Sequence, residues 1–194
     1  MYDAVADPYC YLQTTVLKNR AGLRTQRALT RFETAMAAQR ADEPLPSGQL
    51  SVRHYRAIHR HLFQDVYEWA GDFRTVRISK DGSMFCYPEY IPAEMQKLFA
   101  RLRQDNYLRD LTSGEFIRKA AHFLATLNAI HPFRDGNGRA QLAFLALLAS
   151  QTGHPLRLRQ LRAQMFLAAM IASFHGEEKL LREELRRLLA SGTQ

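Results

Sequence analysis

Two apolar segments, residues 116–129 and 139–150, stand on either side of a short loop that contains a proline and two glycines. Each segment has the composition of a buried helix, with Thr112 or Ser113 as the N-cap of the first and Gly153 ending the second. The longest apolar run, residues 142–149, is too short to cross a bilayer. The sequence therefore predicts a pair of core helices joined by a loop, and no membrane span.

The remaining sequence shows helical spacing in several places and strand-like alternation in one. Further helices are predicted at residues 25–39, 51–66, 92–104, 158–175 and 177–189, and residues 41–48 form a loop. Residues 74–79 and 84–87 are predicted as the two strands of a hairpin whose turn is Lys80-Asp81-Gly82-Ser83. The predicted fold is all-α with one small β-hairpin, in a single domain spanning residues 1–194.

The net charge and the two cysteines indicate which binding partners and which metal or disulfide sites are to be expected. With 27 Lys and Arg against 19 Asp and Glu, the net charge is +8, which attracts polyanions in general. Arginines do not alternate with aromatic residues as single-strand binding requires, so no nucleic acid partner is expected. Cys10 and Cys86 lie far apart and predict neither a disulfide framework nor a zinc site. A reducing, cytoplasmic location fits this usage.

The loop between the apolar segments has the composition of a phosphate cradle. Gly136, Asn137 and Gly138 tolerate backbone conformations closed to bulkier residues. Successive N–H groups in such a turn form an anion-binding nest at the start of the following helix, and Arg139 adds a forked cation. Such glycine-containing sequences also form plain interhelical loops, but the combination with a histidine and an aspartate favours binding.

Three further residues of the loop complete this hypothesis. His131 titrates near neutrality and could take a proton from a hydroxyl nucleophile, although it could also serve as a helix C-cap. Asp135 is a hard oxygen ligand suited to Mg²⁺. Phe133 is predicted to anchor the loop to the core. Base, metal ligand, cradle and cation together suit attack at phosphorus.

Residues 131–139 resemble the Fic (filamentation induced by cAMP) signature HxFx(D/E)GNGRxxR. Residues 16–20, 61–76 and 170–189 are also similar to Fic sequences, so the resemblance spans about residues 12–190. It implies a protein adenylyltransferase that uses ATP and Mg²⁺, with His131 as general base and Asp135 as metal ligand. The nucleotide-binding residues that the signature implies are Phe133, Gly136, Asn137, Gly138 and Arg139.

The resemblance also implies a flap, at about residues 77–87, that binds a segment of a target protein as an added strand. The target would present the Ser, Thr or Tyr hydroxyl that receives AMP. The flap residues expected to bind it are Ile78, Ser79, Lys80, Asp81, Gly82, Ser83, Met84 and Phe85.

One position departs from the family pattern. The last arginine of the signature is replaced by Leu142, which has no charge and no hydrogen-bonding group. Three consequences stay open: weaker ATP binding, another nucleotide or phosphate donor, or altered regulation. A degenerate Fic domain that binds nucleotide or a partner without catalysis is the alternative from another class.

The regulatory sequence of the family is matched only in part. Residues 173–178 resemble the inhibitory motif (S/T)xxxE(G/N) without its last position, and are predicted to be structural. Inhibition would then need a small separate antitoxin that supplies a glutamate. Alternatively, the chain is the catalytic part of a longer effector that is delivered into a host cell.

Overall fold

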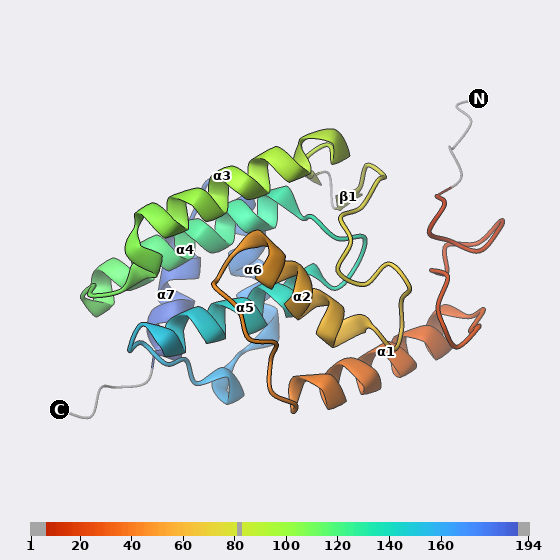
Figure 1. Ribbon diagram of the computed structural model, residues 1–194, viewed down its shortest axis with the longest axis horizontal. Helices are drawn as coiled ribbons and strands as arrows, with labels where there is room; N and C mark the ends of the chain where they lie inside the picture. The colour runs from red at the N-terminus through yellow and green to blue at the C-terminus, as the bar shows by residue number, and fades with distance from the viewer. Residues whose placement is uncertain (1–6, 81–82, 190–194) are drawn as a thin grey trace.

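A computed structural model describes residues 7–80 and 83–189 of the chain (Figure 1). The α-helices of this part are α1 (Gln26–Ala41), α2 (Val52–Phe63), α3 (Ile91–Gln104), α4 (Ser113–Ile130), α5 (Asn137–Gln151), α6 (Ala163–Phe174) and α7 (Lys179–Leu188). Short 3-10 helices are η1 (Pro88–Tyr90), η2 (Asn106–Leu108) and η3 (Leu158–Gln160). Two short strands, β1 (Ser79–Lys80) and β2 (Ser83–Met84), pair antiparallel. The predominantly helical prediction is confirmed.

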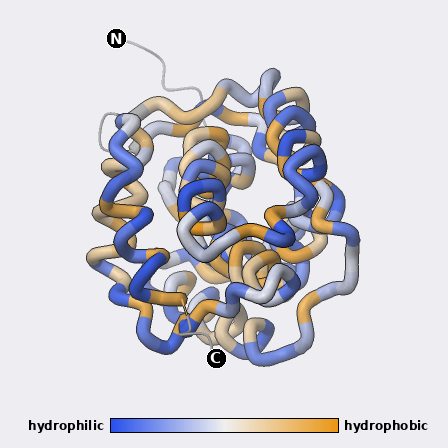
Figure 2. Tube along the Cα trace, turned by 90° about the vertical axis from the view of Figure 1, so that its left-hand side faces the viewer, coloured by the Kyte–Doolittle hydropathy of each residue, from blue (hydrophilic) through white to orange (hydrophobic). Residues whose placement is uncertain are grey.

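Helix α4 is the central element of the molecule. It packs against α3, α5, α6 and α7, and α3 runs beside it in Figure 1. The outer helices carry hydrophilic and hydrophobic residues in alternation along their turns, as Figure 2 shows. Among the described residues, no helix combines the length and hydropathy needed to cross a membrane. The two apolar segments of the sequence thus form the core pair α4 and α5.

N-cap side chains fix where three helices begin, and one of these caps, Thr112, was predicted. The hydroxyl of Thr25 accepts from the Ala28 N–H of α1, and Ser51 accepts from the His54 N–H of α2. Thr112 and Glu115 form a reciprocal capping box at the start of α4. These starts were predictable because each cap is a contact between residues three apart.

The predicted helix at residues 158–175 is wrong in its first part. Residues 158–160 form the 3-10 helix η3, and Leu161 is extended, so α6 begins only at Ala163. The Arg157 N–H donates to the Leu188 carbonyl (2.7 Å), and the Arg187 guanidinium donates to the Gln160 carbonyl (2.9 Å). This pairing with the end of α7 outweighs the local helical pattern.

The predicted strand at residues 74–79 is also wrong, except at its last residue. The Arg74 N–H donates to the Pro132 carbonyl (2.9 Å) instead of to a return strand, so pairing starts only near Ile78, whose carbonyl accepts from the Phe85 N–H. The returning chain then leaves the pair, because the Cys86 N–H donates to the Ala129 carbonyl of α4 (3.1 Å). Asp81 and Gly82, the predicted turn, lie outside the described residues.

A buried arginine ties this region to the end of α4. Arg74 is 2% exposed, and its guanidinium donates to the carbonyls of Ile130 (3.3 Å), His131 (2.8 Å), Val76 (2.7 Å) and Cys86 (2.6 Å). Burial lowers the pKa of Arg74. The last carbonyls of a helix lack partners in their own helix and carry partial negative charge. Arg74 therefore closes the C-terminus of α4 and joins it to Val76 and Cys86, on either side of the strand pair.

A buried histidine of α2 supports the loop between α4 and α5. The Gly71 N–H donates to His59 Nδ1 (2.9 Å), so Nε2 carries the hydrogen and donates to the Asp135 carbonyl (3.0 Å). The ring stacks on Phe133 with centroids 3.7 Å apart. Burial lowers the pKa of His59 to about 3. This histidine is neutral at every physiological pH.

Replacing His59 by glutamine should flatten the acid sensitivity of the fold. The unfolded chain protonates this histidine near pH 6.5 and the folded chain only near pH 3. The stability that His59 contributes is therefore complete above pH 6.5 and falls, by about 1.4 kcal/mol per pH unit, as the pH drops towards 3. Denaturant titrations of both proteins between pH 7 and pH 4.5 measure the difference. His175→Gln, which removes an exposed histidine, should keep the wild-type slope, and equal slopes for all three proteins would contradict this account.

Candidate active site

The loop between α4 and α5 forms one wall of a cavity of about 770 Å³. The polar wall comes from the loop and the start of α5: His131, Arg134, Asp135, Gly136, Asn137, Gly138 and Arg139. The strand pair and the residues next to it, where the flap is expected, contribute Arg77, Ile78, Ser79 and Phe85. The segment that enters α6, and α6 itself, contribute the apolar residues Leu161, Ala163, Phe166, Leu167 and Met170. The cavity thus has a polar wall and an apolar wall.

His131 is both the C-cap of α4 and part of the cavity lining. Its backbone is left-handed, with φ 48° and ψ 62°, and its N–H donates to the Leu127 carbonyl. Ring Nδ1 faces the Asn128 carbonyl at 3.2 Å, and a carbonyl only accepts, so Nδ1 carries the hydrogen of the neutral ring. The lone pair that can take a proton is then on Nε2. Phe85 of the flap stacks on the ring at 3.9 Å and limits its rotation.

Gly136 allows the loop to lie close against α2. Its φ is +78°, and an added Cβ would meet the Phe63 ring at 2.4 Å. Asn137 closes the turn, because its side chain accepts from the Phe133 N–H (2.9 Å) and donates to the Phe133 carbonyl (2.8 Å). The first-turn amides of α5, residues 137–139, have no carbonyl one turn earlier to bind. The start of α5 therefore presents N–H groups to the cavity, which favours an anion.

Arg139 is held from outside the loop. Its guanidinium is ion-paired with Glu33 of α1, which also accepts the Tyr67 hydroxyl, and it lies over the Phe63 ring at 4.5 Å. The Glu33 side chain is 12% exposed, whereas that of Arg139 is 40% exposed and reaches the cavity. Sequence reasoning missed Glu33. The sequence feature that could have identified Glu33 is its spacing. It stands four positions from Leu29 and four from Ala37, the residues that α1 buries, and so lies on the same face of the helix.

Asp135 has the exposure and position of a metal ligand that shares its ion with a substrate. Its side chain is 48% exposed, lies in the cavity lining, and accepts from the Gly136 N–H at 2.6 Å. No group of three or more His, Cys, Asp and Glu side chains in the described ranges could hold a metal ion without substrate. The donor set fits Mg²⁺, which binds through one or two carboxylates and substrate phosphates.

Phe133 does not contact the cavity. It is fully buried and stacks on His59, with Tyr55 and Phe73 as further ring neighbours. Its side chain is therefore the core anchor that its residue type indicates, and the assignment to the nucleotide-binding set is corrected for this side chain. The physical reason is that the loop must be fixed against α2 before its amides can converge.

The expected flap residues fall into different environments. Ile78, Ser79 and Phe85 line the cavity, whereas the Met84 side chain is 57% exposed. The side chains of Lys80 and Ser83 and the whole of Asp81 and Gly82 lie outside what the structure describes. The structure therefore brings three of the expected flap residues to the cavity that His131 also lines.

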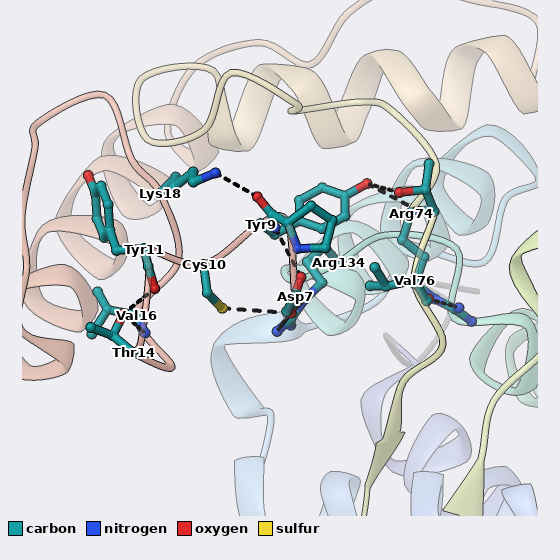
Figure 3. A network of polar contacts seen from close by, with 12 residues as sticks. Asp7, Tyr9, Cys10, Tyr11, Thr14, Val16, Lys18, Arg74, Val76 and Arg134 are labelled. Carbon is teal, nitrogen blue, oxygen red and sulfur yellow. Dashed lines mark hydrogen bonds and ion pairs between the residues drawn. The ribbon is translucent and has the colours of Figure 1, made fainter. Parts of the chain in front are cut away.

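The segment before α1 also reaches the active-site loop, as Figure 3 shows. Asp7 Oδ2 accepts from Arg134 Nε (2.9 Å) and Nη2 (2.6 Å), and Asp7 lies in the cavity lining. The Tyr9 hydroxyl accepts from the Thr75 N–H (3.2 Å). No local sequence pattern indicates the contact between Asp7 and Arg134, because the two residues are 127 positions apart.

Neither Ser173 nor Glu177 of the partial inhibitory motif lines the cavity, although Phe174 between them packs against Phe85. The Ser173 hydroxyl donates to the Met170 carbonyl within α6, and Glu177 is exposed and absent from the cavity lining. This geometry agrees with the prediction that residues 173–178 are structural.

Comparison with known proteins assigns the family. The Fic/DOC family profile matches residues 49–149. A probable protein adenylyltransferase, y4lH of Sinorhizobium fredii, is 53% identical over 79% of this chain and 80% of its own length. The probable protein adenylyltransferase Fic of Escherichia coli K12 is 37% identical over 76% of this chain and 74% of its own length.

Solved structures show the same fold. The BepC protein, a VirB-translocated effector of Bartonella tribocorum with bound AMPPNP, has a TM-score of 0.85 and 26% identity, and covers 95% of this chain and 97% of its own. The N-terminal Fic domain of a Bartonella quintana effector with bound ADP has a TM-score of 0.86 and 27% identity over 95% of each chain. The loop, the helix pair and the sequence matches together lead to one conclusion: this chain belongs to the Fic/DOC family.

Proposed function

We propose that the protein transfers AMP from ATP to a hydroxyl side chain of a target protein. One observation carries the proposal: a single cavity is lined by His131, Asp135, Arg139 and the start of α5. These groups supply a base, a metal ligand and an anion site at one place. Relatives named as protein adenylyltransferases, and a related structure with bound AMPPNP, support the same activity.

The reaction assigns each group of the loop a separate task. The target hydroxyl oxygen attacks the α-phosphorus, an O–P bond forms, and the bond to the bridging oxygen breaks with release of pyrophosphate. The hydroxyl proton passes to His131 Nε2. Arg139 and the amides at the start of α5 balance the negative charge of the phosphates. Asp135 would hold Mg²⁺, which neutralises charge on the leaving pyrophosphate.

The target segment would reach the cavity along the flap. The β1 and β2 strands lie beside His131, because Phe85, one residue after β2, stacks on its ring. An extended segment that pairs with the flap backbone would place one of its side chains over the cavity without needing one particular sequence. We assign this role to residues 77–87.

The second candidate function is the same kind of transfer from a nucleotide or phosphate donor other than ATP. The observation that favours it is Leu142. Leu142 lies in the cavity lining where the family signature has an arginine. It also lines a second hollow between α1 and α5, beside Glu33 and Arg139. Without a cation there, neither the end of a triphosphate nor the inhibitory glutamate of a small antitoxin would find the usual partner. We also propose that a small antitoxin inhibits the protein, and that the protein is cytoplasmic or is delivered into a host cell.

The variant His131→Ala should retain the fold and bind ATP nearly as tightly as the wild type. Label transfer from α-labelled ATP to a lysate protein should fall by about two to four orders of magnitude, because the proton acceptor is lost. His175→Ala, which removes a histidine outside the cavity, is the matched control. Undiminished transfer by His131→Ala would refute the assigned base.

The variant Asp135→Asn should separate metal binding from nucleotide binding. In EDTA, wild type and variant should bind ATP with similar affinity, and added Mg²⁺ should strengthen binding only for the wild type. Calorimetry with ATP in both buffers measures this. Glu177→Gln removes an exposed carboxylate outside the cavity and should behave as wild type. An equal response to Mg²⁺ in Asp135→Asn would place the metal on another residue.

The variant Leu142→Arg should restore a preference for the γ-phosphate. A charge-assisted hydrogen bond contributes about 1.5–3 kcal/mol, which corresponds to about a tenfold to hundredfold gain in affinity. We expect the wild type to bind ADP nearly as well as ATP, and the variant to prefer ATP. Calorimetry with both nucleotides tests this. A wild type that already prefers ATP by a hundredfold would show that another basic residue holds the γ-phosphate.

A further inference from the structure

Gln141 of α5 is a buried amide at the cavity that the proposed chemistry does not use. It is 2% exposed and belongs to the cavity lining. Its Nε2 atom is buried, and within the described part of the chain it has no hydrogen-bond partner. A carboxamide nitrogen can only donate. The folded protein therefore holds an unsatisfied buried donor on a residue that lines its active-site cavity.

Two other buried side-chain amides at the same cavity do have hydrogen-bond partners, so an unpartnered amide nitrogen is the exception there. Asn137 Nδ2 donates to the Phe133 carbonyl (2.8 Å), and Asn128 Nδ2 donates to the Met170 carbonyl (3.2 Å). An unpartnered buried donor destabilises the folded state, and an apolar side chain of similar length would avoid that cost. Packing alone therefore does not explain a glutamine at position 141.

The lining of the cavity indicates what the donor would meet. If phosphates bind the loop and the start of α5, as the proposed function requires, the nucleoside extends toward the rest of the lining. That part is mostly apolar, with Phe166, Leu167 and Met170 from α6, and suits the faces of a base. Asn128 already uses its donor. Gln141 thus adds an N–H donor to a lining that is mostly apolar, which is the usual composition of a specific ligand site.

We propose that Gln141 is a nucleotide-recognition residue whose Nε2 donates a hydrogen bond to an acceptor atom of the nucleoside, on the base or the sugar. The proposal rests on the proposed function, since it needs a nucleotide in this cavity. It assigns discrimination to a side chain of α5 that lies outside the phosphate cradle.

The test separates stability from binding. In Gln141→Met, which keeps the length and removes the donor, the nucleotide-free protein should unfold at the same or a higher temperature than the wild type. Its affinity for ATP should fall about threefold to tenfold, as expected for one neutral hydrogen bond. Its affinity for inorganic tripolyphosphate should stay unchanged. Gln151→Met, at the exposed end of the same helix, is the matched control. Gln141→Leu removes the same donor with a different apolar side chain and should give the same result.

The nucleotide arms identify the acceptor. Equal losses for ATP, GTP, CTP and UTP place it on the sugar, and unequal losses place it on the base; both results support the proposal. A lower unfolding temperature with unchanged ATP affinity would show a structural amide and overturn it. Parallel losses for ATP and tripolyphosphate would move the contact to phosphate and also overturn it. A folded wild type that binds no nucleotide would remove the proposed function together with this inference, whereas binding by wild type and Gln141→Met alike removes this inference alone.

Discussion

The buried guanidinium of Arg74 is the interaction on which the catalytic end of α4 depends. The helix ends at the buried residue Ile130, and Arg74 donates to the carbonyls of Ile130 and His131. The same group donates to two carbonyls of the flap region, so the histidine and the flap share one support. Because the His131 backbone is left-handed, it needs such surrounding contacts to persist. The position of His131 and the path of the chain into and out of the strand pair are therefore set together.

The phosphate side of the loop has a separate support, provided by α2. His59 fixes the Asp135 carbonyl, and Phe63 lies where any side chain at position 136 would have to go. Arg139 is in turn directed by Glu33 of α1, so its guanidinium stands at the cavity before any ligand arrives. Preorganised charge of this kind contributes more to catalysis than charge that must be gathered during the reaction. The loop is thus held at one end by Arg74 and at the other by α1 and α2.

Much of this could be predicted from sequence where the determining contacts are local. The caps at Thr25, Ser51 and Thr112 act over three residues, and the loop from His131 to Arg139 carries its groups in one short segment. Prediction failed where contacts between residues far apart in the sequence determine the local structure. The strand at residues 74–79 is lost because the Arg74 N–H binds Pro132, and Glu33 and Asp7 join the site only through the fold. Phe133 shows a second limit, since its place in the signature implied ligand contact, whereas its residue type predicted the packing that the structure shows.

The cavity combines two kinds of residue that can change independently. The loop contributes backbone N–H groups and side chains that residues of other helices hold in place. Substitutions in the loop therefore disturb the fold as well as the chemistry. Gln141 and Leu142 lie on the next turn of α5 and act on a ligand only through their side chains. Under the proposed function, a change at either position can alter which donor is accepted while His131, Asp135 and the start of α5 stay in place. The departure of this chain from its family pattern falls at Leu142, where the physics of the site permits a change of donor without loss of the reaction.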